Sequence, residues 1–561
     1  MQLRFPDERC LRHSLLTRPS AATHVGRVSD PTHVGWVSAP TRSGQSPNLR
    51  KCAHRAPFLG PKTPIGPFLV MVGLVLAPWF SHAADRGNGP TDDRASDQAT
   101  ETPPNIVYII SDDQMWTDFG FMGNPRVATP HLDALAAGSA RFVNGYVPSS
   151  VCRPSLATLL TGLYPHQHGL HFNHGPPGNA GYNRMTSRRE YVETRSREFE
   201  LIRRLETLPG LLGCERGYRS LQTGKFWEGP WENGQFTEGM TRFEAPPEDQ
   251  TFGGLRVLAS GERVAHGNGD IGLAIGRRTM KPIEDFIQDG EADKTPWLVW
   301  YAPYLPHQPH DSPEPFYQIA AARPDVAEHE LPYFAAIAQF DETVGQLVRL
   351  VQDAGAASRT LFVFVVDNGW SPSTTPQRGR PEEFAATATS KWAPFDAGVR
   401  TPILLSWEGV IQPATHATPV STVDLLPTML SAAGVPMAKR PALPGQDLMP
   451  VARGQADLDP RRPVFGELYP NDATQLGRPE LDIRYRWVRR GDYKLIVPTS
   501  GAGQKTWRTY LDGPALFDLA KDPHETENVI HRKDLADTVA DLRQQLDHWW
   551  DGVQNRIQPS P

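Results

Sequence analysis

Short, predominantly apolar runs of strand length recur along the chain, and they constrain its fold more than any other feature. These runs are Ile106–Ile110, Trp297–Tyr301, Leu361–Val366 and Pro402–Trp407. An unbroken apolar run of this length is typical of a strand that is covered on both faces. Helical patterns lie between the runs, at Leu132–Ala137, Tyr333–Ala354 and Val423–Ala433. The alternation predicts an α/β fold, with a large, mainly parallel β-sheet sandwiched by helices.

The pattern changes after residue 455. Short predicted strands separated by turns precede one helical pattern. They are Tyr485–Val488, Tyr493–Val497 and Ala515–Asp518, and the helix is Asp534–Trp550. Short neighbouring strands with one helix predict a smaller C-terminal antiparallel α+β subdomain. We therefore expect the main domain over residues 104–455 and the subdomain over residues 456–561.

The N-terminal region has the pattern of a secretory signal. Ile65–Phe80 is apolar, follows Lys62 and leads into small residues that end at Ala84. A membrane span is the alternative, but the run is short and contains prolines. We expect residues 61–84 to be a cleaved signal peptide, which predicts a periplasmic or secreted protein without a membrane span after cleavage. Residues 85–103 would be a polar linker. Residues 1–60 hold a tandem repeat and are expected to be disordered, or to reflect a misassigned start codon.

Composition excludes some classes of function. The formal net charge is -6 without a basic excess, so nucleic acid is not an expected partner. Of the four cysteines, only Cys152 and Cys214 follow the expected signal, and two cysteines make no disulfide framework. A single Cys152–Cys214 bridge is one interpretation. A chemical role for Cys152 is the other, and its surroundings favour it.

Polar side chains follow two of the predicted strands at the point where each strand ends. Asp112 and Asp113 follow the first strand, and Asp367 and Asn368 follow a later one. Right-handed crossovers place the carboxyl ends of parallel strands along one edge of the sheet, where ligands bind. Carboxylate and amide oxygens suit Ca²⁺ or Mg²⁺ better than zinc. The two strand ends together predict a divalent-metal site.

A predicted helix that begins at a cysteine is the second site feature. Pro154 fits the first turn of a helix and Gly162 fits the position just past its end, so Cys152 should lie at the N-terminus. Free N–H groups at this end of a helix favour anions. We expect the thiol of Cys152 to be acidified there, and a bound sulfate or phosphate to be stabilised.

These features resemble those of a known family. Cys-x-Pro-Ser followed by Leu-x-Thr-Gly, after a strand that ends in Asp-Asp, resembles the signature of the type I sulfatases, the formylglycine-dependent members of the alkaline-phosphatase superfamily. The resemblance covers about residues 105 to 530. Further sequence blocks are similar to blocks of that family and follow in the same order. These blocks are Thr223-Gly224-Lys225, Pro306-His307-Gln308-Pro309, Asp367-Asn368-Gly369, Lys391–Pro402, Leu516–Leu519 and Asp522–Thr526.

The resemblance implies an exported sulfuric ester hydrolase that acts on a sulfated carbohydrate or an aryl sulfate. In the family the motif cysteine is oxidised to formylglycine by a dedicated maturation machinery, which would be a partner of this chain. One hydroxyl of the hydrated aldehyde, activated by the metal, attacks sulfur, and collapse of the other hydroxyl expels sulfate.

Roles are implied for individual residues as well. Cys152 would be the nucleophile precursor and would also contact the metal. The metal would be Ca²⁺, with Mg²⁺ as the alternative, held by Asp112, Asp113, Asp367 and Asn368. Lys225 and Lys391 would neutralise sulfate oxygens. His307 would hydrogen-bond the ester or protonate the leaving oxygen.

Two positions depart from the family pattern. The family usually has arginine four residues after the cysteine, where this chain has Leu156, and histidine two residues after the first lysine, where it has Trp227. Leu156 lacks the charge that supports the nucleophile and that maturation enzymes read, and Arg153 should project elsewhere on the helix. We therefore expect poor conversion of Cys152. The Leu156→Arg substitution should improve it, unless Leu156 packs in an apolar site.

Two other functions remain as alternatives. One is a phosphate mono- or diesterase of the same superfamily, with Cys152 modified or unmodified. The other is a catalytically impaired homologue that binds the metal and an anion, which Leu156 favours. The retained lysines, His307 and the metal ligands favour the sulfatase instead. The Arg- and Glu-rich segment Thr186–Leu208 is expected to be a solvated helical face or an insertion.

Overall fold

The structure is a computed structural model that describes residues 103–244, 255–267, 270–370, 389–499 and 510–552. The described residues all belong to one compact unit that spans His82–Pro561. Three expected N-terminal segments lie outside the described residues. They are the repeat region at 1–60, the signal at 61–84 and nearly all of the linker at 85–103. In the part of the chain that is described, no helix has the length and apolar character needed to cross a membrane.

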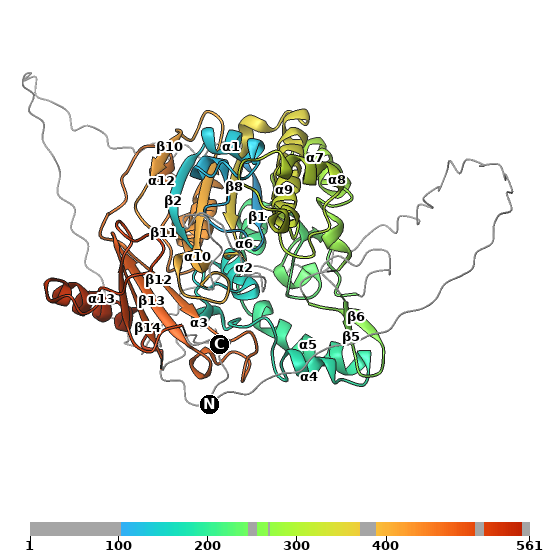
Figure 1. Cartoon of the computed structure of the whole chain (residues 1–561). Coiled ribbons are helices and arrows are strands. Elements are labelled where there is room, and N and C mark those ends of the chain that lie inside the picture. Colours follow the sequence, from blue (N-terminus) through green and yellow to red (C-terminus); the bar gives the residue numbers. More distant parts are fainter. Residues whose placement is uncertain (1–102, 245–254, 268–269, 371–388, 500–509, 553–561) are drawn as a thin grey trace, which may run out of the picture. The chain divides into compact units, whose positions relative to one another are not determined.

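A mostly parallel sheet forms the centre of this unit (Figure 1). Its strand order is β10-β2-β9-β8-β1-β7-β3-β4, and β11 pairs with β2. The strands are β1 (Asn105–Ser111), β2 (Ala140–Tyr146), β3 (Arg219–Gly224), β4 (Glu238–Gly239), β7 (Trp297–Ala302), β8 (Thr360–Val366), β9 (Arg400–Ser406), β10 (Ala414–His416) and β11 (Val420–Ser421). The expected α/β fold is confirmed.

One predicted strand runs against the others. β1 pairs in parallel with β7 and β8, but β9 runs antiparallel to β8 and β2. The apolar run Pro402–Trp407 is therefore a strand of the opposite direction, and its N-terminal end lies at the edge where β1 and β8 end. An apolar run predicts burial and does not encode strand direction.

Helices cover both faces of the sheet. One layer contains α1 (Pro130–Ala137), α7 (Lys281–Asp293) and α9 (Leu331–Asp353), and the other contains α2 (Cys152–Thr161), α6 (Leu208–Arg216) and α11 (Leu425–Ala432). In β1, Val107 and Ile109 pack with the first layer, whereas Ile106, Tyr108 and Ile110 pack with the second. All five side chains are at most 1% exposed. This two-sided burial explains the unbroken apolar run, because successive side chains of a strand point to opposite faces.

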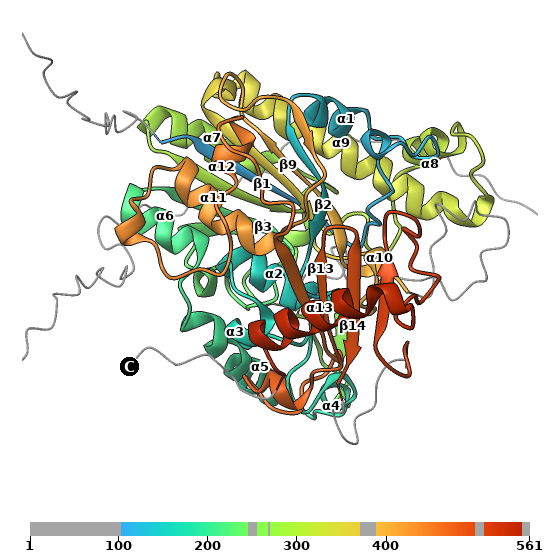
Figure 2. The same cartoon turned by 90° about the vertical axis from the view of Figure 1, so that its left-hand side faces the viewer.

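A second, antiparallel sheet follows in the chain, in the order β12-β13-β14-β15. Its strands are β12 (Pro463–Leu468), β13 (Tyr485–Arg490), β14 (Tyr493–Pro498) and β15 (Ala515–Asp518). The helix α13 (Ala536–Trp549) covers one face through Leu542 and Leu546 (Figure 2). The other face packs on the end of β2 and beside α10 (Asp396–Val399), with Tyr146 and Trp487 in the contact. The predicted antiparallel α+β subdomain is confirmed, although the sequence prediction missed β12.

The remaining α-helices and strands of the described residues lie around these two sheets. They are α3 (Pro165–His168), α4 (Asn179–Asn183), α5 (Arg188–Arg203), α8 (Glu314–Ala321), α12 (Met449–Ala452), β5 (Leu255–Val257) and β6 (Arg263–Ala265). The helix α5 is not a fully solvated face, contrary to the prediction for Thr186–Leu208. Arg195 and Glu198 are buried on it and form an ion pair at 3.0 Å. Charged residues can be buried when they are paired in this way, and sequence composition alone does not reveal the pairing.

Candidate active site

The ends of β1 and β8 lie side by side, because these strands pair in parallel along their whole length. Asp113 N donates to Asp367 Oδ1 at 3.0 Å, and Asn368 Nδ2 donates to Asp113 Oδ1 at 2.7 Å. Asp112, which precedes Asp113, is held by a hydrogen bond from its N–H to Leu305 O at 3.0 Å. The four predicted metal-binding side chains are each at most 2% exposed. The structure thus brings them together in one buried cluster at the edge of the sheet.

Two buried lysines neutralise this cluster. Lys225, at the end of β3, has its Nζ 2.6 Å from Asp112 Oδ2 and 3.3 Å from Asp367 Oδ2. Lys391 Nζ lies 2.5 Å from Asp113 Oδ1. Burial alone would lower the pKa of Lys225 and raise the pKa of Asp113. The opposite charges outweigh burial, so the pKa of Lys225 is raised well above its ordinary value and that of Asp113 is lowered.

Asp112 behaves differently from Asp113. Burial, together with the nearby charge of Asp367, raises the pKa of Asp112 well above its ordinary value despite the attraction of Lys225. Burial also raises the pKa of Asp367. Two lysines therefore do not fully offset the cost of burying three carboxylates, and the cluster retains a demand for positive charge.

Cys152 is the first residue of α2, as the sequence predicts, and the helix ends at Gly162 with a φ of 66°. Cys152 is a free cysteine that is 2% exposed, so the Cys152–Cys214 bridge is not formed. Its Sγ lies 3.9 Å from Asp113 Oδ1. Burial raises the pKa of the thiol to about 12, although Lys225 and Lys391 oppose the rise. The expected acidification of the thiol is wrong, because desolvation outweighs the effect of the helix N-terminus.

His307 reaches the cluster from the loop after β7. Its Nε2 lies 3.3 Å from Asp113 Oδ2, and its ring stacks on Tyr304 with a centroid distance of 4.3 Å. The side chain of His307 is 21% exposed, compared with 4% for Lys391 and 2% for Lys225. Its largely buried position lowers the pKa of His307 to about 3, against the attraction of Asp113. Among the predicted site residues, His307 is thus the side chain most accessible to an incoming ester.

The donor set fits a hard divalent cation. Ligand atoms of Asp112, Asp113, Cys152 and His307 all lie within 4.8 Å of one another. An independent observation comes from Asn368, whose Oδ1 is buried and has no hydrogen-bond partner among the described residues. An orphaned amide oxygen beside carboxylates is a ligand that Ca²⁺ and Mg²⁺ both use. The residues present therefore fit the cation that the resemblance implies.

Comparison with known proteins decides the family. A family model described as Sulfatase matches residues 104–435, and one described as N-sulphoglucosamine sulphohydrolase, C-terminal, matches residues 390–551. The chain belongs to the sulfatase family. The type I sulfatase identification is thereby confirmed, and the class of reaction is hydrolysis of a sulfate ester.

Individual sulfatases and solved structures agree with this assignment. Human arylsulfatase A is 28% identical to this chain, over 78% of this chain and 85% of its own length. The N-acetylgalactosamine-6-sulfatase of the dog, Canis lupus familiaris, is 27% identical over 75% of this chain and 81% of its own length. The crystal structure of Ps i-CgsB in complex with k-i-k-neocarrahexaose has a TM-score of 0.58 and 20% identity, and covers 82% of this chain and 95% of that chain. The similarity to the Ps i-CgsB structure shows that the two chains share a fold.

The two departures from the sulfatase pattern have structural reasons. Leu156 is 6% exposed and packs in the apolar core between the sheet and the layer of α2, α6 and α11, and Trp227 belongs to the same core at 4% exposed. Arg153 does project elsewhere, as expected. Its guanidinium donates to Glu228 Oε1 at 2.7 Å and to Glu198 Oε2 at 2.5 Å, and all three residues are buried. This arginine therefore serves a buried ion network and does not replace the missing arginine at position 156.

Sequence reasoning missed two residues that support His307. Tyr304 stacks on the His307 ring and has Lys225 Nζ 5.3 Å from its own ring centroid. Arg277 donates to Pro303 O at 3.0 Å and to Pro309 O at 3.4 Å, so it ties together the two ends of the loop that carries His307. Tyr304 precedes His307 by three residues and could have been suspected from that spacing. Arg277 is distant in sequence, and no local pattern marks it.

Proposed function

We propose that this sulfatase is exported, matures by oxidation of Cys152 to formylglycine and binds Ca²⁺ through Asp112, Asp113, Asp367 and Asn368. It would release sulfate from a carbohydrate or an aryl ester, with the reaction in the main domain at residues 104–455. The observation that carries the proposal is the buried cluster at the ends of β1 and β8. There the carboxylates, the two lysines and the first residue of α2 meet within hydrogen-bonding or ion-pair distance.

The chain's own residues would bind and orient the sulfate group. A divalent cation would offset most of the negative charge of the three carboxylates and would activate a hydroxyl group, which formylglycine would supply at position 152. Lys225 and Lys391 serve as counterions of the carboxylates in this structure. With a cation beside the carboxylates, these ammonium groups could bind sulfate oxygens instead and stabilise the charge that develops there.

His307 would act on the leaving oxygen of the ester. It is the most accessible of the proposed catalytic side chains, and its ring is held in place by the stack on Tyr304. With its lowered pKa the imidazole is neutral and can hydrogen-bond the ester oxygen. Negative charge that a bound sulfate brings beside it would raise that pKa, so that His307 could protonate the leaving alkoxide or phenoxide as the S–O bond breaks. Arg277 would contribute indirectly, because its two hydrogen bonds fix the loop between Pro303 and Pro309.

Removal of the metal is expected to destabilise the protein. The three buried carboxylates of the cluster repel one another, and a bound cation reduces this repulsion. A cation that binds only the folded state adds about 2.7 kcal/mol to the free energy of unfolding when its concentration is a hundred times its dissociation constant. Dialysis against a chelator should lower the Tm by at least about 3 °C, and Ca²⁺ or Mg²⁺ should restore it. The Asn368→Ala variant should lose most of this chelator effect. An unchanged Tm in chelator, without rescue by either cation, would contradict the metal site.

Export makes a prediction about the N-terminus of the mature protein. Protein recovered from the periplasm or the medium of its native host should begin near Ala84, because the apolar run before it has the length and flanks of a cleaved signal. N-terminal sequencing checks this start. Recovery of Ile65–Phe80 in a membrane fraction would instead identify an anchor.

A further inference from the structure

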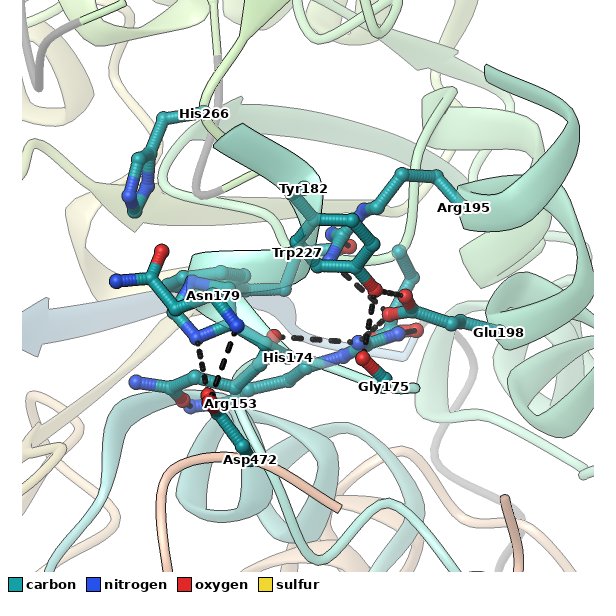
Figure 3. Close-up of polar contacts among 12 residues, drawn as sticks. Arg153, His174, Gly175, Asn179, Tyr182, Arg195, Glu198, Trp227, His266 and Asp472 are labelled. Atoms are coloured by element: carbon teal, nitrogen blue, oxygen red, sulfur yellow. Dashed lines mark hydrogen bonds and ion pairs between the residues drawn. The ribbon is translucent and has the colours of Figure 1, made fainter. Parts of the chain in front are cut away.

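Three aromatic rings from separate segments meet beside the proposed active site. They belong to His174, Trp227 and His266, and Figure 3 draws them with the polar network around them. The ring centroids of His174 and His266 are 5.6 Å apart, and Trp227 lies 6.0 Å from each histidine. The interplanar angles are 88°, 81° and 69°, so the rings meet edge to face. We call this group the ring cluster.

Each ring of the ring cluster carries a buried nitrogen without a hydrogen-bond partner among the described residues. These atoms are His174 Nε2, Trp227 Nε1 and His266 Nδ1. Within the described ranges, no other histidine has a buried ring nitrogen of this kind. An unsatisfied buried polar group costs about 1–3 kcal/mol, and native proteins keep few of them. The rings that carry these three atoms lie against one another, so one hydroxyl-bearing ligand, or ordered water in its place, can satisfy the three nitrogens together.

His174 is held in a defined orientation. Its Nδ1 lies 3.2 Å from Asp472 Oδ1, and the other oxygen of Asp472 accepts a hydrogen bond from Asn179 N at 3.1 Å (Figure 3). A carboxylate that accepts the Nδ1 proton leaves Nε2 as an acceptor, whereas a hydrogen bond from Asn471 Nδ2, 3.1 Å from the same Nδ1, leaves Nε2 as a donor. A hydroxyl group can pair with Nε2 in either form. Asp472 and Asn471 thus hold the ring in place, and the His174 side chain is 4% exposed.

The ring cluster is electrically neutral, although arginines lie behind it. Arg195 is paired with Glu198 at 3.0 Å, and Arg153 with Glu198 and Glu228. Burial lowers the pKa of His174 below its ordinary value and that of His266 to about 3. A third buried arginine nearby, Arg256, donates to the backbone and side-chain oxygens of Asn179. Neutral imidazoles and an indole N–H bind hydroxyl groups. The chemistry of the ring cluster therefore favours a neutral, hydroxyl-bearing ligand.

The ring cluster adjoins the proposed sulfate-binding residues on two sides. On one side, Asn173 precedes His174 in the chain and accepts a hydrogen bond at Oδ1 from Arg153 N at 3.0 Å. Arg153 follows Cys152 directly, in the first turn of α2. On the other side, Trp227 follows Lys225 by two residues. A substrate whose sulfate lies between Cys152 and Lys225 would have the ring cluster as a neighbour of its leaving group.

We propose that His174, His266 and Trp227 form the subsite that binds the leaving group of the substrate as a hydroxyl-bearing sugar ring. The three rings would line the buried end of the subsite, and their unpartnered nitrogens would bind hydroxyls of the sugar. This inference rests on the proposed function, since it names the substrate class of the same site.

The test compares sugar and aryl substrates. N-acetylgalactosamine-6-sulfate and N-sulphoglucosamine are assayed beside para-nitrophenyl sulfate, which has no sugar ring. The His174→Ala variant is expected to lower the ratio of sugar to aryl kcat/KM by about tenfold or more, mainly through KM, because one buried hydrogen bond is worth about 1.4 kcal/mol or tenfold. His174→Gln keeps a polar group near the place of Nε2 and should recover part of the ratio. His131→Ala removes another histidine–carboxylate pair, with Glu342 at 3.2 Å, and should leave the ratio unchanged.

A binding experiment separates this inference from the proposed function. In Cys152→Ala protein, saturation-transfer NMR with N-acetylgalactosamine-6-sulfate should show binding that is lost when His174→Ala is added. Sugar binding of this kind without turnover of any sulfate ester by the wild type would support the subsite and count against the proposed function. Equal losses on sugar and aryl esters in His174→Ala, or sugar binding that survives this substitution, would overturn the subsite. Turnover of para-nitrophenyl sulfate without binding or turnover of either sugar would overturn it too.

Discussion

The Cys152→Ala substitution is expected to lower the sulfatase kcat by at least about 10³-fold, because it removes the precursor of the nucleophile. Cys152 is buried 3.9 Å from Asp113 and begins α2, so alanine should fit there without disturbing the helix. Turnover of para-nitrophenyl sulfate measures the effect. A control truncation outside the site is Ser431→Ala in α11, which should keep the activity of the wild type.

The same experiment separates the three candidate functions when the Cys152 peptide is analysed by mass spectrometry. Oxidation to formylglycine replaces the thiol group and one hydrogen of Cβ with a carbonyl oxygen, which changes the mass of the peptide. Sulfatase activity should rise with the aldehyde fraction between preparations, and full sulfatase activity in a preparation that carries only thiol would contradict the proposal. Hydrolysis of para-nitrophenyl phosphate by the thiol form would favour the phosphoesterase. Complete conversion with neither activity would favour the impaired, binding homologue.

Local sequence was enough to predict the parts of the site that follow directly from strand and helix ends. Asp112 and Asp113 end one buried strand and Asp367 and Asn368 another, and parallel pairing of β1 with β8 brings them together. Pro154 and Gly162 marked the two ends of α2 and so placed Cys152 at its first turn. In each case a short sequence pattern determines where a strand or helix begins or ends. The topology of the sheet then determines which of these ends lie next to one another.

The features that sequence did not predict depend on contacts between distant segments. The pKa of Cys152 is set by burial under the surrounding loops, which outweighs the helix terminus that the sequence made visible. Arg195 and Glu198 looked like surface charges because Arg153, which also pairs with Glu198, lies in another helix. The ring cluster joins residues 174, 227 and 266, and no periodicity links such positions. Patterns of charge and hydropathy describe one segment at a time and leave such pairings open.

The Leu156→Arg substitution is expected to lower the free energy of unfolding by about 3–5 kcal/mol, because it places an unpaired charge in the core. Leu156 is 6% exposed among the apolar side chains of α2, α6 and α11. The carboxylates that contact the first turn of α2 already have partners, since Asp113 is paired with Lys391 and both Glu198 and Glu228 with Arg153. Urea unfolding measures the loss. Leu156→Met conserves the volume and should cost less than about 1.5 kcal/mol.

This substitution also tests why the chain lacks the arginine of its family. If maturation reads that arginine, Leu156→Arg should raise the aldehyde fraction at Cys152 even while it weakens the fold, and the two quantities are measured independently on one sample. A variant that is better converted but less stable would mean that packing of α2 and efficient conversion compete at this position. A variant as stable as the wild type would show that the guanidinium finds a partner among the site carboxylates, and our account of Leu156 as a core residue would be wrong. A wild-type chain that is fully converted would show instead that maturation does not need the arginine, so that packing alone explains leucine at position 156.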